Sequence, residues 1–481
     1  MEHKRSYSLV YKNSVILTFL RLVEPGLAMV VIVAVSRVLG TEAMGGYAFI
    51  ITFISMFSAI GQMGLQALLT REVAADREKS SSYLSAALLL GLGSSVILAF
   101  VMNGLKGYFN LSPAVSQGVF LMSLDLFPIF AIATFEAVFM GWERTDFILY
   151  QNISGNIVRV ALSLLFIRLG FGLVSLVAAV IASTLFSVAV CAFTYARRLG
   201  ALSFRVDLGV SLRLLRISPT FLLITVVAVL SARLDVLILT KLTDMTQVAL
   251  YAAAYKLFEA TLIVPQSYMR ASFPHLSALF RSAPDAFSRA NRDMLRHVLL
   301  YAFPTAAVTV ALAPLLVSLL YGGKFATSAA LLRVLAIGLI PWSMGRTTAN
   351  ILLATNLQKY DLLSGVFTVV TSIALNICMI PVYGAMGAAL SSAAAWSVFF
   401  LCELYFSRRA GYGVALGRAF GRPLLAGAGV FAVAWVGMLG WVCASIEWAC
   451  LAAAALFYFK NSRNRQKLAR PFVLFQEIMK A

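Results

Sequence analysis

Predominantly apolar runs of about 20 residues or more recur along the chain, and they constrain its fold more than any other feature. Clear examples are residues 14–38, 46–69 and 217–240. An α-helix rises about 1.5 Å per residue, so about 20 apolar residues span the ~30 Å hydrocarbon core of a bilayer. Hydrophobic residues are 61% of the chain and charged residues only 12%, which is too little charge to cover a soluble protein of this size. The sequence therefore predicts an all-α, polytopic membrane protein.

A sliding window of hydropathy places about 14 transmembrane helices along the chain. Short polar segments, such as 71–82 and 197–207, separate them. The predicted spans are 14–38, 46–69, 82–103, 118–140, 149–168, 172–195, 214–240, 246–268, 294–320, 327–352, 361–382, 385–407, 421–439 and 441–459. The first run is too long for the apolar part of a signal peptide and a second span follows it directly, so we expect no cleavable leader.

Lys and Arg are distributed unevenly between the polar segments, and the formal net charge is +19. If the N-terminus is cytoplasmic, most of the 39 basic residues fall in inside segments. The outside segments hold only a few: Arg37, Lys106, Arg168, Lys241 and Lys324. This asymmetry predicts that both termini are cytoplasmic. It also explains the positive charge through anionic membrane lipid, so we expect membrane lipid and no nucleic acid among the partners.

Motifs of catalysis and metal binding are missing from the sequence. The five cysteines fall within predicted spans without CxxC spacing, and the three histidines form no cluster. The segment 322–324 reads Gly-Gly-Lys but lacks the spacing of a phosphate-binding loop. The outside loops are short, which leaves no room for a catalytic domain. We therefore expect no catalytic residues, no metal and no cofactor, with transport as the leading class; a membrane scaffold or a polytopic enzyme is the alternative outside transport.

The sequence contains weak internal repeats that are separated by slightly more than 200 residues. A basic residue and a Tyr-Ala pair recur at the same spacing, and a Ser-Gly pair recurs at the start of a span: Arg37…Tyr47-Ala48 with Lys241…Tyr251-Ala252, and Ser154-Gly155 with Ser364-Gly365. Six spans per repeat mean that both repeats enter the membrane from the same side, so the axis relating them runs along the membrane normal. The prediction is two six-helix lobes related by a pseudo-two-fold, plus two C-terminal helices, with boundaries at 1–200, 201–410 and 411–481.

Charged residues within the predicted spans are the most informative about function. Each Arg, Lys or Asp at a helix centre costs ~2.5–3.5 kcal/mol to insert, so we expect each to face protein or water. They are Arg21 and Glu24 in the first span, Asp125 and Glu136 in the fourth, Arg159 in the fifth, Arg233 and Asp235 in the seventh, Lys256 and Glu259 in the eighth, and Arg346 in the tenth. Cations at several depths of a wet cleft suit an anionic substrate, particularly a phosphate or pyrophosphate. For Arg21 with Glu24 and for Lys256 with Glu259, a purely structural ion pair on one helix face is the alternative.

Several segments of the chain resemble a known family of exporters. They are Ala-Arg-Leu-Asp-Val-Leu-Ile-Leu-Thr-Lys-Leu at 232–242, Ala-Leu-Tyr-Ala-Ala-Ala-Tyr-Lys-Leu at 249–257, the turn at 39–48 and Gly-Trp-Glu-Arg at 141–144. Together they resemble the Wzx-like polysaccharide and oligosaccharide-lipid flippases of the multidrug/oligosaccharidyl-lipid/polysaccharide exporter superfamily. The resemblance covers nearly the whole chain, although these segments are loose hydrophobic patterns rather than a signature.

The resemblance implies a two-lobed bundle with alternating access in the bacterial cytoplasmic (inner) membrane. Its substrate would be a polyprenyl-pyrophosphate-linked oligosaccharide, a unit of O-antigen, capsule or exopolysaccharide, and polysaccharide assembly proteins would be further partners. It also implies a cavity lined largely by the first, second, seventh and eighth spans. We expect the substrate to contact Arg21, Glu24, Arg159, Arg233, Asp235, Lys256 and Arg346. Glu24, Asp235 and Glu259 are the candidates for coupling to a proton or cation.

Two alternatives within the same superfamily stay open at the level of sequence. One is a lipid II flippase, which these patterns separate poorly from an oligosaccharide-lipid flippase. The other is a multidrug or cation antiporter, which would need acidic or aromatic rather than basic groups in its cavity. Lys256 stands where the resembling flippases often carry Arg, and this exchange keeps the charge but loses the planar fork of a guanidinium.

Overall fold

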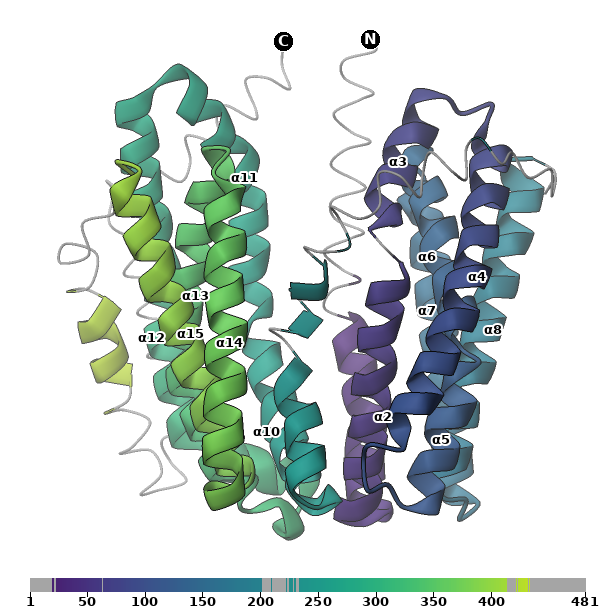
Figure 1. Cartoon of the computed structure of the whole chain (residues 1–481). Coiled ribbons are helices and arrows are strands. Elements are labelled where there is room, and N and C mark those ends of the chain that lie inside the picture. Colours follow the sequence, from purple (N-terminus) through teal and green to yellow (C-terminus); the bar gives the residue numbers. More distant parts are fainter. Residues whose placement is uncertain are drawn as a thin grey trace.

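The structure is a computed structural model, and it describes residues 20, 23–62, 64–200, 209, 222, 225–227, 229–230, 233–412, 421, 423–430 and 432. Within these residues every regular element is a helix, as the sequence predicts. Figure 1 shows the helices arranged as two bundles side by side. We call residues 20–200 the N-half and residues 233–412 the C-half.

The N-half covers the described parts of the first six predicted spans. Residues 23–38 are helical and lead directly into the second span. The labelled helices of this half are α2 (Gly40–Gly61), α3 (Leu65–Ala75), α4 (Ser80–Lys106), α5 (Pro113–Ser123), α6 (Leu126–Gly141), α7 (Thr145–Arg168) and α8 (Leu173–Arg198). The pairs α2 with α3 and α5 with α6 each occupy one predicted span.

The C-half repeats this plan. Residues 233–242 are helical and form the described part of its first span. The labelled elements are α10 (Met245–Thr261), α11 (Ile263–Ser282), α12 (Pro284–Tyr321), the short 3-10 helix η1 (Gly323–Phe325), α13 (Ser328–Ala354), α14 (Gln358–Tyr383) and α15 (Ala385–Arg409). Of the two predicted C-terminal helices, the one at 441–459 lies outside the described residues, and 423–430 are helical within the other.

Seven described helices are long and apolar enough to cross a membrane, and nine spans result if each of two bent helix pairs counts as one. The bent pairs are α5 with α6 and α10 with α11, and each bends by 40°. The remaining predicted spans are α7, which carries polar and charged residues along its length, and segments that are described only in part. The chain is therefore a multi-pass membrane protein.

Proline explains both bends, which the predicted continuous spans 118–140 and 246–268 did not anticipate. A proline lacks the N–H that would bond to the carbonyl four residues earlier, and its ring clashes with that carbonyl. Pro128 stands four residues after Leu124, where α5 has ended. Pro265 stands four residues after Thr261, the last residue of α10. The break after α2 has a different cause, because Gly64 has a φ of 67° and starts α3 from the left-handed region.

The two halves share a hydrophobic core at only one end of the bundle. The largest cluster of buried apolar side chains contains members of both halves, including Val35, Met44, Leu239 and Val248. Toward the other end each half has its own cluster, one around Val73 and Phe139 and another around Leu276 and Phe287. We call these the closed end, where α2 and α10 pack together, and the open end, where α3 and α11 lie apart (Figure 1).

Arg37 and Lys241, the basic residues of the internal sequence repeat, make equivalent contacts across the closed end. The Nε of Arg37, in the N-half, donates to the carbonyl of Leu320 near the end of α12 at 2.9 Å. The Nζ of Lys241, in the C-half, donates to the carbonyl of Tyr108, just after α4. Each residue lies in the last turn of the first span of its half and reaches the end of the third span of the other half. These reciprocal contacts fit the pseudo-two-fold relation between the lobes.

The direction of the helices separates the basic residues into two groups. The open end carries many, among them Arg71, Arg77, Lys79, Arg197, Arg198, Arg408 and Arg409. The closed end carries Arg37, Lys106, Arg168, Lys241 and Lys324. The two groups that the sequence assigns to the inside and to the outside therefore lie at opposite ends of the bundle.

Candidate functional site

A cavity lies between the halves, next to the packed helices of the closed end. Its inner part has a volume of about 140 Å³ and is lined by α2, by residues 233–236 and by α10. A larger part of about 530 Å³ continues toward the open end between residues 24–29 and the α10–α11 bend. Lys256 and Glu259 line both parts. We call the two parts the inner cavity and the vestibule.

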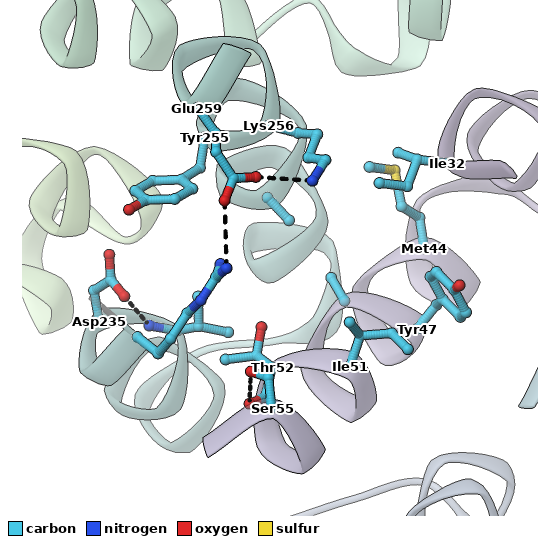
Figure 2. A pocket seen from close by; sticks show the side chains of 14 residues that line it. Ile32, Met44, Tyr47, Ile51, Thr52, Ser55, Asp235, Tyr255, Lys256 and Glu259 are labelled. Carbon is cyan, nitrogen blue, oxygen red and sulfur yellow. Dashed lines mark hydrogen bonds and ion pairs between the residues drawn. The ribbon is translucent and has the colours of Figure 1, made fainter. Parts of the chain in front are cut away.

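Three charged side chains of the C-half meet in the inner cavity, and we call them the charged triad. The Nζ of Lys256 lies 2.8 Å from one carboxylate oxygen of Glu259, and a guanidinium nitrogen of Arg233 lies 3.4 Å from the other. Figure 2 shows both ion pairs as dashed lines. Each side chain keeps between 25% and 36% of its surface exposed, so all three remain open to the cavity. Two cations with one carboxylate leave a net charge of +1.

Asp235 lines the same cavity but is bound differently. Its side chain is almost fully buried. One carboxylate oxygen accepts hydrogen bonds from the hydroxyl groups of Tyr251 and Ser392, the latter at 3.3 Å. Tyr251 and Ser392 also lie 3.1 Å apart, which closes a polar cluster between α10 and α15. Asp235 therefore points away from Arg233 although the two residues are only two positions apart.

The N-half wall of the inner cavity carries no charged side chain among its described residues. Met44, Tyr47, Ile51, Thr52 and Ser55 of α2 line it (Figure 2). The Ser55 hydroxyl donates to the carbonyl of Thr52 at 2.7 Å, so its proton is engaged within the helix. This wall is apolar with a few hydroxyl groups, and the charge of the inner cavity lies on the C-half.

The vestibule adds one acid from the N-half and further polar groups from the C-half. Glu24 is exposed on its wall, beside Pro25 and opposite Gln266 and Arg270 of α11. Arg21, the cation predicted beside Glu24, lies outside the described residues. The structure thus brings together Glu24, Arg233, Asp235, Lys256 and Glu259 along one continuous cavity.

The two other predicted contacts, Arg159 and Arg346, do not line either part of the cavity. Arg159 of α7 interacts electrostatically with Tyr47 on the N-half wall, and no described residue accepts a hydrogen bond from its Nε. Arg346 of α13 interacts electrostatically with Tyr255 on the C-half wall. Each therefore lies outside the cavity lining and interacts with a tyrosine that belongs to it.

The sequence analysis did not select four residues that line the cavity: Thr52, Ser55, Tyr255 and Gln266. Thr52 and Ser55 are polar residues three positions apart in an apolar span, so their spacing on one helix face was a usable signal. The ring of Tyr255 lies 5.9 Å from the guanidinium carbon of Arg233, and only the fold reveals this contact. The described residues include no group of three or more His, Cys, Asp or Glu side chains that could hold a metal ion.

Solved structures with a similar fold include several transporters. The lipid II flippase MurJ in an inward closed conformation has a TM-score of 0.75 and 13% identity, over 94% of this chain and 99% of that one. An inward-facing multidrug resistance transporter of the MATE family, in the MOP superfamily, has a TM-score of 0.70 and 15% identity, over 82% of this chain and 98% of that one. A MOP superfamily transporter from Pyrococcus furiosus has a TM-score of 0.60 and 14% identity, over 83% and 95%. At these identities the likeness shows a shared fold.

Sequence comparison gives the family itself. No curated protein matches the chain at a significant level. A family model described as polysaccharide biosynthesis protein matches residues 10–280, more than half of the chain, including the N-half and the charged triad. The chain therefore belongs to the polysaccharide biosynthesis protein family.

Proposed function

We propose that this protein is a flippase that moves a polyprenyl-pyrophosphate-linked oligosaccharide across the bacterial cytoplasmic membrane by alternating access. The observation that carries the proposal is the charged triad on the C-half wall of the cavity. A pyrophosphate carries several acceptor oxygens, and Arg233 and Lys256 supply the charged donors that bind such oxygens strongly. The apolar N-half wall then leaves room for the uncharged parts of the substrate.

Glu259 gives the site a means of releasing its substrate. Its carboxylate is paired with both Arg233 and Lys256 in the structure, so an arriving pyrophosphate has to displace the carboxylate from these cations. When the substrate leaves, Glu259 returns and the cations do not stay unpaired in a low-dielectric site. Glu24 in the vestibule and Asp235 with its two hydroxyl donors are the other candidates for coupling to an ion.

The paired state of the acids favours an anionic substrate over the cationic drug of an antiporter. Glu259 is engaged by two cations and Asp235 by two hydroxyl groups. A cationic substrate would find no unengaged carboxylate among the described residues that line the inner cavity. We further propose that the open end faces the cytoplasm, because it carries most of the described basic residues.

Export by Arg233→Gln and Lys256→Gln variants tests the function. Each charged hydrogen bond contributes about 1.5–3 kcal/mol, which corresponds to a loss of about ten- to 150-fold per variant. In a strain that lacks the chromosomal copy, we expect less surface polysaccharide and accumulation of the lipid-linked intermediate. Lys359→Gln is the matched control, since Lys359 is an exposed cation on α14 outside the cavity. Wild-type export by both cavity variants would show that the assignment is wrong.

A further inference from the structure

Glu403 of α15 is a carboxyl group that the cavity does not use. It is fully buried, and within the described part of the chain neither of its oxygens accepts a hydrogen bond of good geometry, although the Ser364 hydroxyl lies close to it. The nearby hydroxyl groups are already engaged: Ser407 donates to the carbonyl of Leu404 at 3.1 Å, and Ser364 to that of Tyr360 at 3.0 Å. Burying an ionised carboxylate without hydrogen bonds is strongly unfavourable. Glu403 therefore needs a proton or a charged partner.

The group that faces Glu403 is a second carboxyl, that of Asp361 on α14. The two side chains lie within hydrogen-bonding reach of each other. An ionised carboxylate has no donor, so this bond exists only when one of the two carries a proton. Asp361 is half-buried and lies in the first turn of α14, where the helix dipole stabilises negative charge. The proton therefore resides on the deeper group, Glu403, and Asp361 accepts its hydrogen bond.

Arg346 of α13 is the cation that acts on both carboxyl groups. Its guanidinium carbon lies 5.0 Å from the ring centroid of Phe399, one turn before Glu403 on α15. It makes no ion pair within 4.0 Å with any residue that the structure describes. Arg346 also interacts with Tyr255, which lines the inner cavity. Arg346 therefore interacts electrostatically both with the acid pair and with a residue of the cavity wall.

We propose that Asp361 and Glu403 form a proton-binding site, and that its proton controls whether Arg346 turns toward this acid pair or toward the cavity. When the proton is bound, the acid pair carries one negative charge. When the proton is lost, the pair carries two negative charges, and these attract Arg346 away from an anionic ligand in the cavity. Cys402, beside Glu403 on α15, is the other titratable group that senses this charge. A sodium ion is disfavoured because Arg346, which interacts with both carboxyl groups, repels a cation. The link to the cavity rests on the proposed function, whereas the proton site itself does not.

Infrared difference spectroscopy of the purified full chain tests the proton site directly. A protonated carboxyl group has a carbonyl stretch that a carboxylate lacks. We expect such absorption at neutral pH in the wild type, less of it in Glu403→Gln and a shift of its frequency in Asp361→Asn. Glu259→Gln is the matched control and leaves the band unchanged, because Glu259 is paired with two cations. Identical bands in wild type and Glu403→Gln, or a band that responds to sodium rather than to pH, would overturn the proposal.

Binding of farnesyl pyrophosphate at a series of pH values tests the role of Arg346. Affinity in the wild type falls by about tenfold when the pair loses its proton, within the usual range of coupling between two sites. Glu403→Gln keeps the higher affinity at every pH, and Arg346→Gln has the lower affinity at every pH. Equal pH dependence in wild type and Glu403→Gln would refute the coupling. If farnesyl pyrophosphate does not bind the wild type, the proposed cavity function is wrong, and the infrared band still decides the proton site.

Discussion

The two ends of the bundle are held together by different kinds of contact. At the closed end both halves contribute to one apolar core, and Arg37 and Lys241 each donate across to a carbonyl of the opposite half. Toward the open end the apolar clusters belong to one half or the other. The cavity with its charged triad (Figure 2) lies next to the shared core, since Met44 and Val236 belong to both.

This difference shows where an alternating-access motion meets resistance. For the cavity to open toward the other side of the membrane, the contacts between the two halves at the closed end have to break. The clusters at the open end can remain intact while each half moves as a unit. Substitutions at the closed end should therefore alter the balance between conformations, and equivalent substitutions within one half should alter only local packing.

The largest effect is expected where the backbones of the two halves come closest. A Cβ at Gly45 of α2 would lie 1.9 Å from the carbonyl oxygen of Met245, so Gly45→Ala forces the halves apart. Overpacking of this kind costs about 1–3 kcal/mol. We expect a lower midpoint of thermal unfolding, followed by circular dichroism in detergent, and impaired export.

Gly93→Ala is the control for this prediction. Gly93 lies within α4, and a Cβ there would meet nothing within 4 Å. Because alanine favours a helix by about 1 kcal/mol over glycine, this variant should be as stable as the wild type or more so. Equal unfolding midpoints for the two variants would mean that the contact between α2 and α10 does not hold the closed end together.

A smaller effect is expected from removing the two reciprocal contacts. Arg37→Ala and Lys241→Ala each remove a cation from a carbonyl at a helix end, an interaction of about 0.3–1 kcal/mol. The two contacts are separate in space, so their effects should add in the double variant. The measurement is the rate at which a membrane-impermeant maleimide labels a cysteine at Ala48, which lines the inner cavity. We expect faster labelling from the closed-end side; unchanged rates in the double variant would contradict this.

The sequence predicted the helices well because membrane thickness fixes their length and apolar character. It missed the bends at Leu124 and Leu262, although Pro128 and Pro265 were visible. Proline is tolerated in transmembrane helices because neighbouring helices satisfy the freed backbone groups, so its presence alone does not determine a bend. Whether a span bends depends on tertiary packing.

In the candidate site, too, the sequence predicted the charged residues but not their side-chain partners. Arg233 and Lys256 stand out in the sequence because charge is rare in an apolar span. Their arrangement around Glu259, 26 residues from Arg233, depends on how the seventh and eighth spans pack. The bond of Ser392 to Asp235 joins residues 157 positions apart, and the meeting of Asp361 with Glu403 depends on the register between α14 and α15. Side-chain partners of this kind require the tertiary structure.

The smallest effect is expected at the start of α10, which has a cap that α2 lacks. The Asp244 side chain accepts a hydrogen bond from the backbone N–H of Gln247 at 2.8 Å, whereas Leu39 before α2 offers no such group. Asp244→Ala should lower the free energy of unfolding by about 0.5 kcal/mol, the lower end of the range for an N-cap, and Asp244→Asn should keep nearly all of it, because asparagine caps a helix as well as aspartate does. Chemical unfolding in detergent measures both values. Since Asp244 is exposed and belongs to one half, export should persist in both variants, and a loss of export in Asp244→Asn would mean that the residue does more at the closed end than cap its helix.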